Sequence, residues 1–96
     1  MDLDQVKRSI NAVRGDLERR HPIRLIGVFG SVARDEARGD SDIDILAEAR
    51  PGLSLFKLGA VQLALEEALG HPVDLVFEDA LSPGIRSRVR AELQPL

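Results

Sequence analysis

Residues 30–46 have the sequence GSVARDEARGDSDIDIL, and this stretch decides how the chain folds. It opens with Gly30-Ser31, directly after an apolar run, and closes with Asp42-Ile43-Asp44-Ile45, in which acidic and apolar residues alternate. Strict alternation has the period of a half-buried strand, so both carboxylates point to one face of it. Glycine permits the sharp turn that ends the preceding strand. The stretch therefore predicts a strand, a turn with a short helical segment over residues 31–37, and a second strand that carries two acidic side chains.

The segments on either side alternate between helical and strand patterns. Apolar residues at spacings of three and four predict amphipathic helices over residues 3–20, 54–69 and 83–93. Short apolar runs predict buried strands at residues 23–29 and 72–78. We therefore expect a single α/β domain over residues 1–96, in the order αβαβαβα, with a three-stranded mixed sheet and helices packed on it.

Polar residues and glycine mark the expected helix ends. Asp2 or Asp4 is placed to cap the first helix, and Ser54 to cap the helix that runs to about residue 69. Gly70 follows as a C-terminal stop. Ser82-Pro83 has the pattern of an N-cap followed by proline at the first helical position.

A third acidic residue, Asp74, lies inside the predicted strand 72–78, with the opposite parity to the apolar residues of that strand. If the strands are neighbours, Asp74 joins Asp42 and Asp44 on one face. Three like charges held close together repel one another unless a cation joins them. Carboxylates suit Mg²⁺ or Mn²⁺, and two such ions can hold the attacking and leaving oxygens of a phosphoryl transfer. An Asp-x-Asp pair alone is more often a solvated strand edge; the third carboxylate favours a metal site.

Gly30-Ser31 lies where a strand gives way to a helix, so its backbone N–H groups and hydroxyl can donate hydrogen bonds to a phosphate. The alternative is that glycine only makes the turn and serine only caps the helix. Arg34, one helical turn further, either reaches a nucleotide phosphate or pairs with a nearby carboxylate. The carboxylates in its reach are Asp35, Glu36 and Asp40. A P-loop and a Rossmann fingerprint are excluded, because neither glycine pattern is present.

The composition excludes several other classes of protein. A net charge of −3 argues against a domain that grips nucleic acid through its overall charge, so nucleic acid is not expected as the main partner. The chain has no Cys, which excludes disulfides and Cys-based zinc sites. No apolar run reaches the length of a membrane span, and the N-terminus lacks the apolar region of a signal peptide. We therefore expect a cytoplasmic protein with no membrane partner.

Residues 30–46 resemble the signature of the DNA polymerase β-like nucleotidyltransferases, and in particular of the minimal nucleotidyltransferases (MNT). The MNT pattern is Gly-Ser-x-Ala-Arg-Gly, an acidic residue, a short gap, and Ser-Asp-x-Asp. Here Gly30-Ser31, Arg34, Ser41-Asp42-x-Asp44 and the later Asp74 occur in that order. One departure is visible, because Asp35 stands where the pattern has glycine. The resemblance covers nearly the whole chain and implies the small αβαβαβα fold of that family.

The resemblance also implies a metal-dependent enzyme that transfers a nucleoside monophosphate from an NTP. In that division of labour Asp42 and Asp44 coordinate two Mg²⁺ ions, with Mn²⁺ as a substitute. Asp74 completes the second metal site and helps to activate the acceptor hydroxyl. ATP is the implied substrate, and its triphosphate would lie against the Gly-Ser turn. The residues implied in nucleotide binding are Gly30, Ser31, Arg34 and Ser41.

The partner implied by the resemblance is a protein. Many MNT proteins are paired with a HEPN-domain toxin, and the MNT protein then resembles an antitoxin that transfers AMP onto a hydroxyl of the toxin. Two alternatives stay open at the level of sequence: a nucleotidyltransferase that modifies a small molecule, and an antitoxin that neutralises its partner by binding alone. Neither the acceptor nor the state of homo- or hetero-oligomerisation follows from the sequence.

Overall fold

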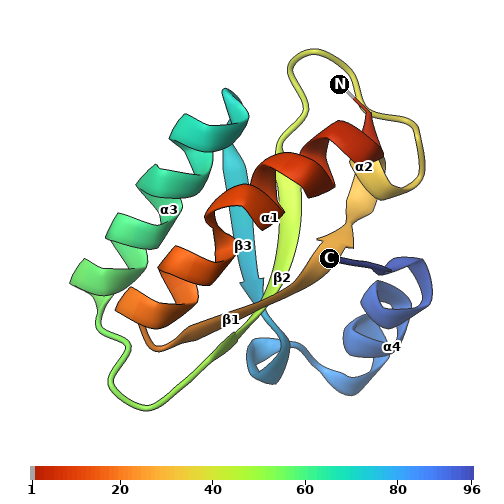
Figure 1. Cartoon of the computed structure of the whole chain (residues 1–96). Coiled ribbons are helices and arrows are strands. Elements are labelled where there is room, and N and C mark those ends of the chain that lie inside the picture. The colour runs from red at the N-terminus through yellow and green to blue at the C-terminus, as the bar shows by residue number, and fades with distance from the viewer. Residues whose placement is uncertain (1) are drawn as a thin grey trace.

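The computed structural model describes residues 2–96 and shows helices packed on a four-stranded sheet (Figure 1). Its elements in chain order are α1 (Leu3–Arg20), β1 (Ile23–Phe29), α2 (Gly30–Ala33), β2 (Ile43–Ala49), α3 (Leu55–Leu69), β3 (Val73–Phe77), the 3₁₀ helix η1 (Glu78–Ala80), α4 (Pro83–Glu92) and β4 (Gln94–Pro95). The strands lie in the order β3-β2-β1-β4. In residues 2–96 no helix is both long enough and apolar enough to span a membrane.

The ends of the two long helices follow the predicted capping residues, whereas Ser82 precedes α4 without a capping hydrogen bond from its side chain. Of the two candidates for α1, it is Asp2 whose side chain accepts a hydrogen bond from Gln5 N, at 2.9 Å. Ser54 caps α3 by accepting from Lys57 N at 3.1 Å. Gly70 ends α3 in the left-handed conformation, with φ of 68°, which glycine adopts without strain. These local signals fix where the two long helices begin and end.

The sheet is mixed, as predicted. β1 pairs antiparallel with β2 and with β4, while β2 pairs parallel with β3. A parallel pair needs a crossover connection, and α3 supplies it between β2 and β3. The crossover brings β3 beside β2, which is the arrangement that the carboxylate prediction required.

The expected three strands are wrong, because the chain adds a fourth. The last helix ends at Glu92 rather than Leu93, and Gln94 and Pro95 pair with Val28 and Gly27 of β1. A two-residue strand that contains proline has no periodic signal in the sequence. Proline is tolerated there because β4 is an edge strand, where its missing N–H leaves no ladder bond unmade.

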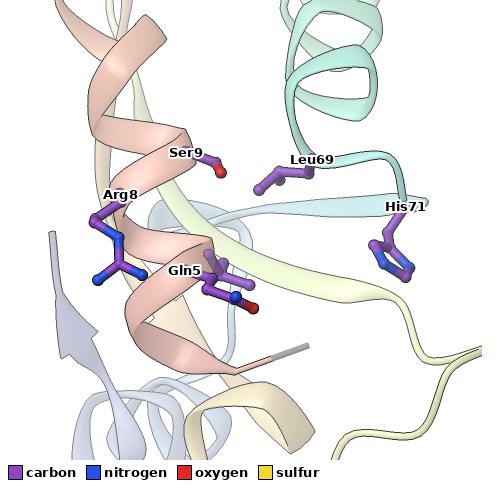
Figure 2. Close-up of a pocket in the computed structure, with 6 residues that line it drawn as sticks. Gln5, Arg8, Ser9, Leu69 and His71 are labelled. Atoms are coloured by element: carbon purple, nitrogen blue, oxygen red, sulfur yellow. The ribbon is translucent and has the colours of Figure 1, made fainter.

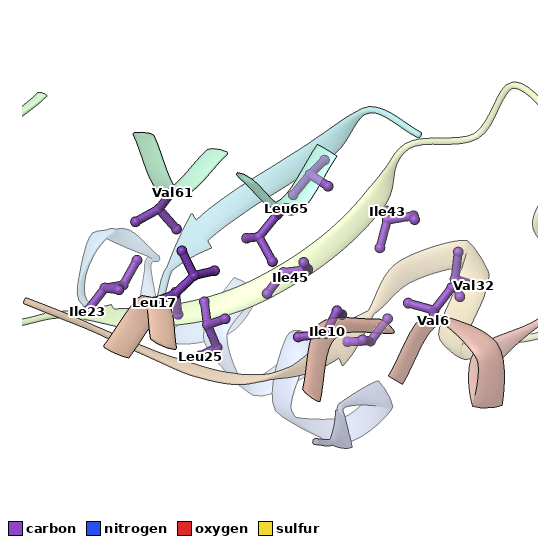
Figure 3. Packing of buried hydrophobic residues seen from close by; sticks show 13 residues of the cluster. Val6, Ile10, Leu17, Ile23, Leu25, Val32, Ile43, Ile45, Val61 and Leu65 are labelled. Carbon is purple, nitrogen blue, oxygen red and sulfur yellow. The ribbon is translucent and has the colours of Figure 1, made fainter. Parts of the chain in front are cut away.

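The hydrophobic core lies between the sheet and the helices α1 and α3 (Figure 3). Its fully buried side chains come from every one of these elements and are aliphatic, as the scarcity of aromatic residues requires. They include Ile10, Leu25, Ile43, Ile45 and Leu65. A β-bulge between Leu25 and Gly27 changes the parity of β1, so that Leu25 and Val28 both enter the same core.

The outer face of α3 is unusually apolar. Leu55 and Phe56 are 88% and 89% exposed, and Leu63 is 58% exposed. The opposite face of the same helix is in the core, through Val61 and Leu65. Clusters of exposed large apolar side chains are typical of surfaces that contact another molecule.

The pairing of β4 with β1 requires a residue without a side chain at position 27, and Gly27 meets this requirement. A Cβ there would lie 2.6 Å from the carbonyl oxygen of Gln94 and 2.8 Å from Leu93 Cδ1. We expect Gly27→Ala to lower the free energy of unfolding by about 1–3 kcal/mol, because β4 must move away. Urea denaturation followed by circular dichroism measures it.

The matched control is Gly59→Ala in α3, where a Cβ would meet nothing within 4 Å. Because alanine is the better helix former, the free energy of unfolding of that variant should be about 0.5–1 kcal/mol higher than that of wild type. Equal effects of the two substitutions would contradict the proposed role of Gly27.

Candidate active site

The Gly30 turn lies directly against Asp44. Gly30 is buried and has φ of 76°, in the left-handed region that favours glycine. A Cβ on Gly30 would overlap Oδ2 of Asp44. Glycine is therefore required twice at this position, once by the backbone and once by the carboxylate beside it. The two ends of the 30–46 stretch meet at this contact.

The sheet register brings two of the three predicted carboxylates side by side. Asp44 is the pairing partner of Asp74 across the parallel strands β2 and β3, and of Phe29 across β1. Side chains of directly paired residues lie on the same face of a sheet. That face is opposite the one on which Ile43 and Ile45 enter the core.

Asp42 lies just outside this pair. The strand was expected to begin at Asp42, but β2 begins at Ile43, so Asp42 is the last residue of the preceding loop. Its parity is that of Asp44, which is two residues further on. Asp42 and Asp74 are exposed, whereas Asp44 is partly buried between them and the Gly30 turn. Solvent reaches the site from the side of the two exposed carboxylates.

Partial burial and like charges raise the pKa of Asp44 to about 6, from an ordinary value of 3.8. Burial is the largest cause, followed by repulsion from Asp74 and then from Asp42. Arg34 opposes the shift, and Glu92 adds to it. The folded chain therefore holds Asp44 in a place where its negative charge is unfavourable, which is the situation that a bound cation relieves.

The donor chemistry of this site fits a hard divalent cation, since its side chains offer only carboxylate oxygens. The three carboxylates do not yet have the spacing of a metal site. Among residues 2–96, no three acidic or histidine side chains lie close enough together to hold a metal ion. A cation held by Asp44 and Asp74 would need Asp42, in the loop before β2, to turn toward it. The roles of the three residues as metal ligands stay predictions.

Arg34 lies beyond a helix that is shorter than expected. The helical segment predicted over residues 31–37 ends at Ala33, and Arg34 is its C-cap residue. Asp35 then has φ of 60°, and it is the only non-glycine residue with positive φ among residues 2–96. The left-handed conformation at Asp35 stops the helix. It also gives a physical reason why the MNT pattern has glycine at this position, since glycine adopts that conformation without strain.

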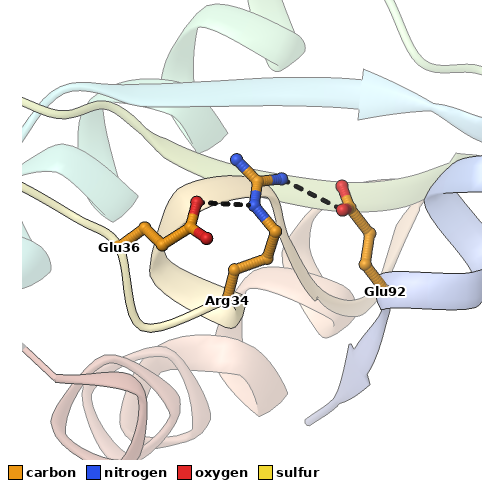
Figure 4. Close-up of polar contacts among 3 residues, drawn as sticks. All are labelled: Arg34, Glu36 and Glu92. Carbon is orange, nitrogen blue, oxygen red and sulfur yellow. Dashed lines mark hydrogen bonds and ion pairs between the residues drawn. The ribbon is translucent and has the colours of Figure 1, made fainter.

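The Arg34 guanidinium is held by two carboxylates (Figure 4). Its Nε donates to Glu36 Oε2 at 3.1 Å, and its Nη1 donates to Glu92 Oε2 at 3.0 Å. Both partners raise the pKa of Arg34. The sequence had left Glu36 open as a partner, but Glu92 was missed because 58 positions separate it from Arg34.

Two serines of the predicted nucleotide site have different surroundings. Ser41 closes the loop before β2: its Oγ accepts from Arg38 N at 2.8 Å, and its own N donates to the Arg38 carbonyl at 3.0 Å. Ser31 is half-buried in the Gly30 turn, and its carbonyl accepts from Glu36 N at 2.8 Å. Ser41 thus shapes the loop that leads to Asp42, whereas Ser31 lies beside the carboxylate contact itself.

A cavity elsewhere on the molecule is separate from these residues. It has a volume of about 480 Å³ and lies between α1 and the end of α3 (Figure 2). Its lining residues are Gln5, Val6, Arg8, Ser9, Leu69 and His71. Val6 belongs to the core between the sheet and these helices, so the cavity opens on the helical face. Asp44 and Asp74 lie on the opposite face of the sheet, so this cavity is not part of the carboxylate site.

Comparison of the sequence with known proteins finds relatives that match almost the whole chain. The family model described as Nucleotidyltransferase domain matches residues 10–96. Protein adenylyltransferase MntA of Thermococcus cleftensis is 39% identical over 93 residues, which cover 97% of this chain and 94% of that protein. A Methanocaldococcus jannaschii protein assigned as a protein adenylyltransferase is 35% identical over 92 residues, which cover 96% and 95% of the two chains.

Solved structures give the same result. A chain assigned as a minimal nucleotidyltransferase has a TM-score of 0.84 and 44% identity, covering 100% of this chain and 97% of its own length. A chain from the Shewanella oneidensis complex of tri-AMPylated HEPN toxin with MNT antitoxin has a TM-score of 0.63 and 25% identity, covering 94% and 70%.

The family model covers residues 10–96, and the chain therefore belongs to the nucleotidyltransferase family. Within the family it is a minimal nucleotidyltransferase, of the group that includes the MntA protein adenylyltransferases.

The raised pKa of Asp44 predicts how the metal-free protein responds to pH. A carboxyl group with a pKa of about 6 in the folded chain and 3.8 in the unfolded chain binds its proton more tightly when folded. Its stabilising contribution is full below pH 3.8 and is lost as pH rises through 6. Asp44→Asn removes this dependence. In EDTA, we therefore expect the variant to become more stable than wild type by about 1–2 kcal/mol as pH rises from 4 to 7.

Thermal unfolding of both proteins at several pH values measures the difference. A stability gap that is constant across this range would show that Asp44 titrates as an ordinary carboxyl group.

The left-handed backbone at Asp35 predicts an order of stabilities. Asp35→Gly should be about as stable as wild type, since relief of backbone strain offsets the greater freedom of the unfolded chain. Asp35→Ala should be about 1 kcal/mol less stable, because alanine lacks the local polar contacts that let aspartate adopt this conformation. Urea unfolding of the two variants tests the order, with Asp79→Ala as a control at a position without positive φ. An alanine variant as stable as the glycine variant would contradict it.

Proposed function

We propose that this protein transfers AMP from ATP onto a hydroxyl group of a HEPN-domain toxin in the cytoplasm, and so acts as the antitoxin of the pair. The observation that carries the proposal is the pairing of Asp44 with Asp74 on one face of the sheet, with the Gly30 turn packed directly against Asp44. Two carboxylates therefore lie beside a turn in which only glycine fits, which supports a role for them as cation ligands next to a phosphate-binding turn.

The proposed cation ligands are Asp42, Asp44 and Asp74, for two Mg²⁺ ions or for Mn²⁺ in their place. The ions would supply positive charge that neutralises the triphosphate and the departing pyrophosphate. The raised pKa of Asp44 supports this assignment, because the metal-free site carries more negative charge than its surroundings accommodate. ATP would lie with its triphosphate along the Gly30-Ser31 turn, within reach of Arg34.

The residues of the chain would do the rest of the chemistry. Asp74 is exposed and therefore open to an incoming acceptor. As a general base it would take the proton of the acceptor hydroxyl while that oxygen forms its bond to the α-phosphorus. The bond between the α-phosphorus and the oxygen that bridges to the β-phosphate breaks, and pyrophosphate leaves. The product is a phosphodiester between AMP and the acceptor.

Two findings support a protein as the acceptor. Thermococcus cleftensis MntA is named a protein adenylyltransferase, and the Shewanella oneidensis complex joins an MNT antitoxin to an AMPylated HEPN toxin. The exposed Leu55, Phe56 and Leu63 on α3 are also a surface of the kind that proteins use to contact one another. A small-molecule acceptor is the alternative within the same chemistry.

The carboxylates are tested by Asp42→Asn combined with Asp44→Asn. The double variant should fold but lose AMP transfer by at least about a thousandfold, because it lacks the charges that hold the cation. The measurement is intact mass of the candidate HEPN partner after incubation with ATP and Mg²⁺. Asp16→Asn combined with Asp79→Asn removes the same charge at exposed positions on α1 and η1 and should leave transfer unchanged.

The outcome also separates the alternatives. Transfer that survives in the double variant would rule out the carboxylate mechanism. If transfer is lost but the variant still neutralises the toxin in growing cells, neutralisation works by binding alone. If the HEPN partner gains no mass with wild type while a hydroxylated small molecule does, the acceptor is wrong and the chemistry stands.

A further inference from the structure

The Arg34–Glu92 ion pair connects two elements that are far apart in the sequence. Arg34 follows α2, and Glu92 is the last residue of α4. Among residues 2–96, no other hydrogen bond between side chains joins residues so distant in the chain. The pair therefore fixes the C-terminal helix relative to the turn that carries Gly30 and Ser31.

Folding stability is not a sufficient reason for this pair. The Arg34 and Glu92 side chains are 44% and 32% exposed, and ion pairs this exposed contribute little to stability because water screens them. The hydrophobic core does not include either residue. What the pair does restrict is the direction of a long side chain that would otherwise sample many rotamers.

The two carboxylates leave most of the guanidinium free. Arginine has five N–H donors, and the hydrogen bonds to Glu36 and Glu92 use one on Nε and one on Nη1. Nη2 has no hydrogen-bond partner among residues 2–96, and Figure 4 shows it on the side of the group away from the Arg34 backbone. The remaining donors form the fork that binds phosphate oxygens in a bidentate manner.

Arg34 also lies close to the Gly30 turn. Arg34 N donates to the Gly30 carbonyl at 3.1 Å, and Gly30 packs directly against the Asp44 carboxylate. The Arg34 side chain therefore starts one helical turn from the contact between Gly30 and Asp44.

Glu92 is itself held in place by the backbone around it. Leu93 N donates to the Arg90 carbonyl at 3.4 Å, and the next two residues pair with β1 as β4. Because β1 leads directly into Gly30, the strand pairing and the ion pair act on the same turn from two sides. A rigid backbone makes Glu92 a suitable anchor for a flexible partner.

We propose that Glu92 is a positioning residue, which holds the Arg34 guanidinium so that its free donors face the phosphates of Mg²⁺-bound ATP. This inference rests on the proposed function, because it assumes that the nucleotide lies at Asp44 and the Gly30 turn. Its effect comes from preorganisation: a side chain that is already oriented loses less freedom when the nucleotide binds.

The test is a double-mutant cycle with Glu92→Gln and Arg34→Ala. The ligand is the ATP analogue AMP-PNP with Mg²⁺, and calorimetric titration of the full chain gives its Kd. We expect Glu92→Gln to weaken binding by about three- to tenfold. In the Arg34→Ala background, Glu92→Gln should have no further effect, because Glu92 acts through Arg34. In AMP transfer, Glu92→Gln should raise KM for ATP more than it lowers kcat.

Glu78→Gln is the matched control. Glu78 of η1 pairs with Arg90 of α4, with Arg90 Nη2 at 2.5 Å from Glu78 Oε2, and Glu78 makes no hydrogen bond or ion pair with Arg34. Glu78→Gln removes an ion pair of α4 and changes the net charge by the same amount as Glu92→Gln. The Kd for AMP-PNP should stay within about twofold of wild type, and the melting temperatures of Glu78→Gln and Glu92→Gln should be similar.

Three results would overturn the proposal. Equal effects of Glu92→Gln in the presence and absence of Arg34 would show that Glu92 acts independently. Tighter binding by Glu92→Gln would show that Glu92 competes with the nucleotide for Arg34. If wild type does not bind AMP-PNP, there is no bound nucleotide toward which Glu92 could orient Arg34. Binding by wild type without any AMP transfer would instead refute the proposed function, while the binding cycle would still decide the role of Glu92.

Discussion

The contact between Gly30 and Asp44 is the constraint on which the rest of the site depends. The backbone of the turn occupies the space beside the carboxylate so closely that even a methyl group does not fit. For this contact to form, β1 must end and β2 must begin at matching positions of the antiparallel pair, where Phe29 lies opposite Asp44. The parallel pairing of β2 with β3 then determines that Asp74 is the neighbour on the other side. The backbone contact therefore depends on the register of β1 with β2, and the register of β2 with β3 adds the second carboxylate.

Most of this arrangement could be predicted because it follows from periods that the sequence carries locally. Alternation in a strand has a period of two, so Asp44 was expected to face away from Ile43 and Ile45, and the structure places it so. Helix caps such as Asp2 and Ser54 depend on residues three positions apart. Signals of this kind need no knowledge of the remainder of the chain.

The features that were missed arise from contacts between distant residues or from single backbone angles. The bulge between Leu25 and Gly27 changes the parity of β1 without a change in residue type. α2 is short because Asp35 has a positive φ, and the presence of an aspartate in the sequence does not predict that conformation. β4 exists only because the edge of β1 is available to it, and Glu92 becomes a neighbour of Arg34 only after α4 has packed. Periodicity carries none of this information.

The charges around Asp44 determine how the proposed cation and nucleotide would affect each other's binding. Its surroundings contain four other carboxylates and one guanidinium. The carboxylates are Asp42, Asp74, Glu36 and Glu92, so with Asp44 ionised the group has a net charge of about −4. A free triphosphate would meet strong repulsion here, because Arg34 is already shared between two carboxylates.

A divalent ion reverses the sign of that interaction, since it attracts the phosphates and the carboxylates together. We therefore infer that each ligand strengthens the binding of the other, and linkage requires the effect to be reciprocal. The three acidic side chains do not form a complete metal site by themselves, and this agrees with a site in which cation and phosphates bind together. A site that closes only when cation and phosphates arrive together has no need to be fully assembled beforehand.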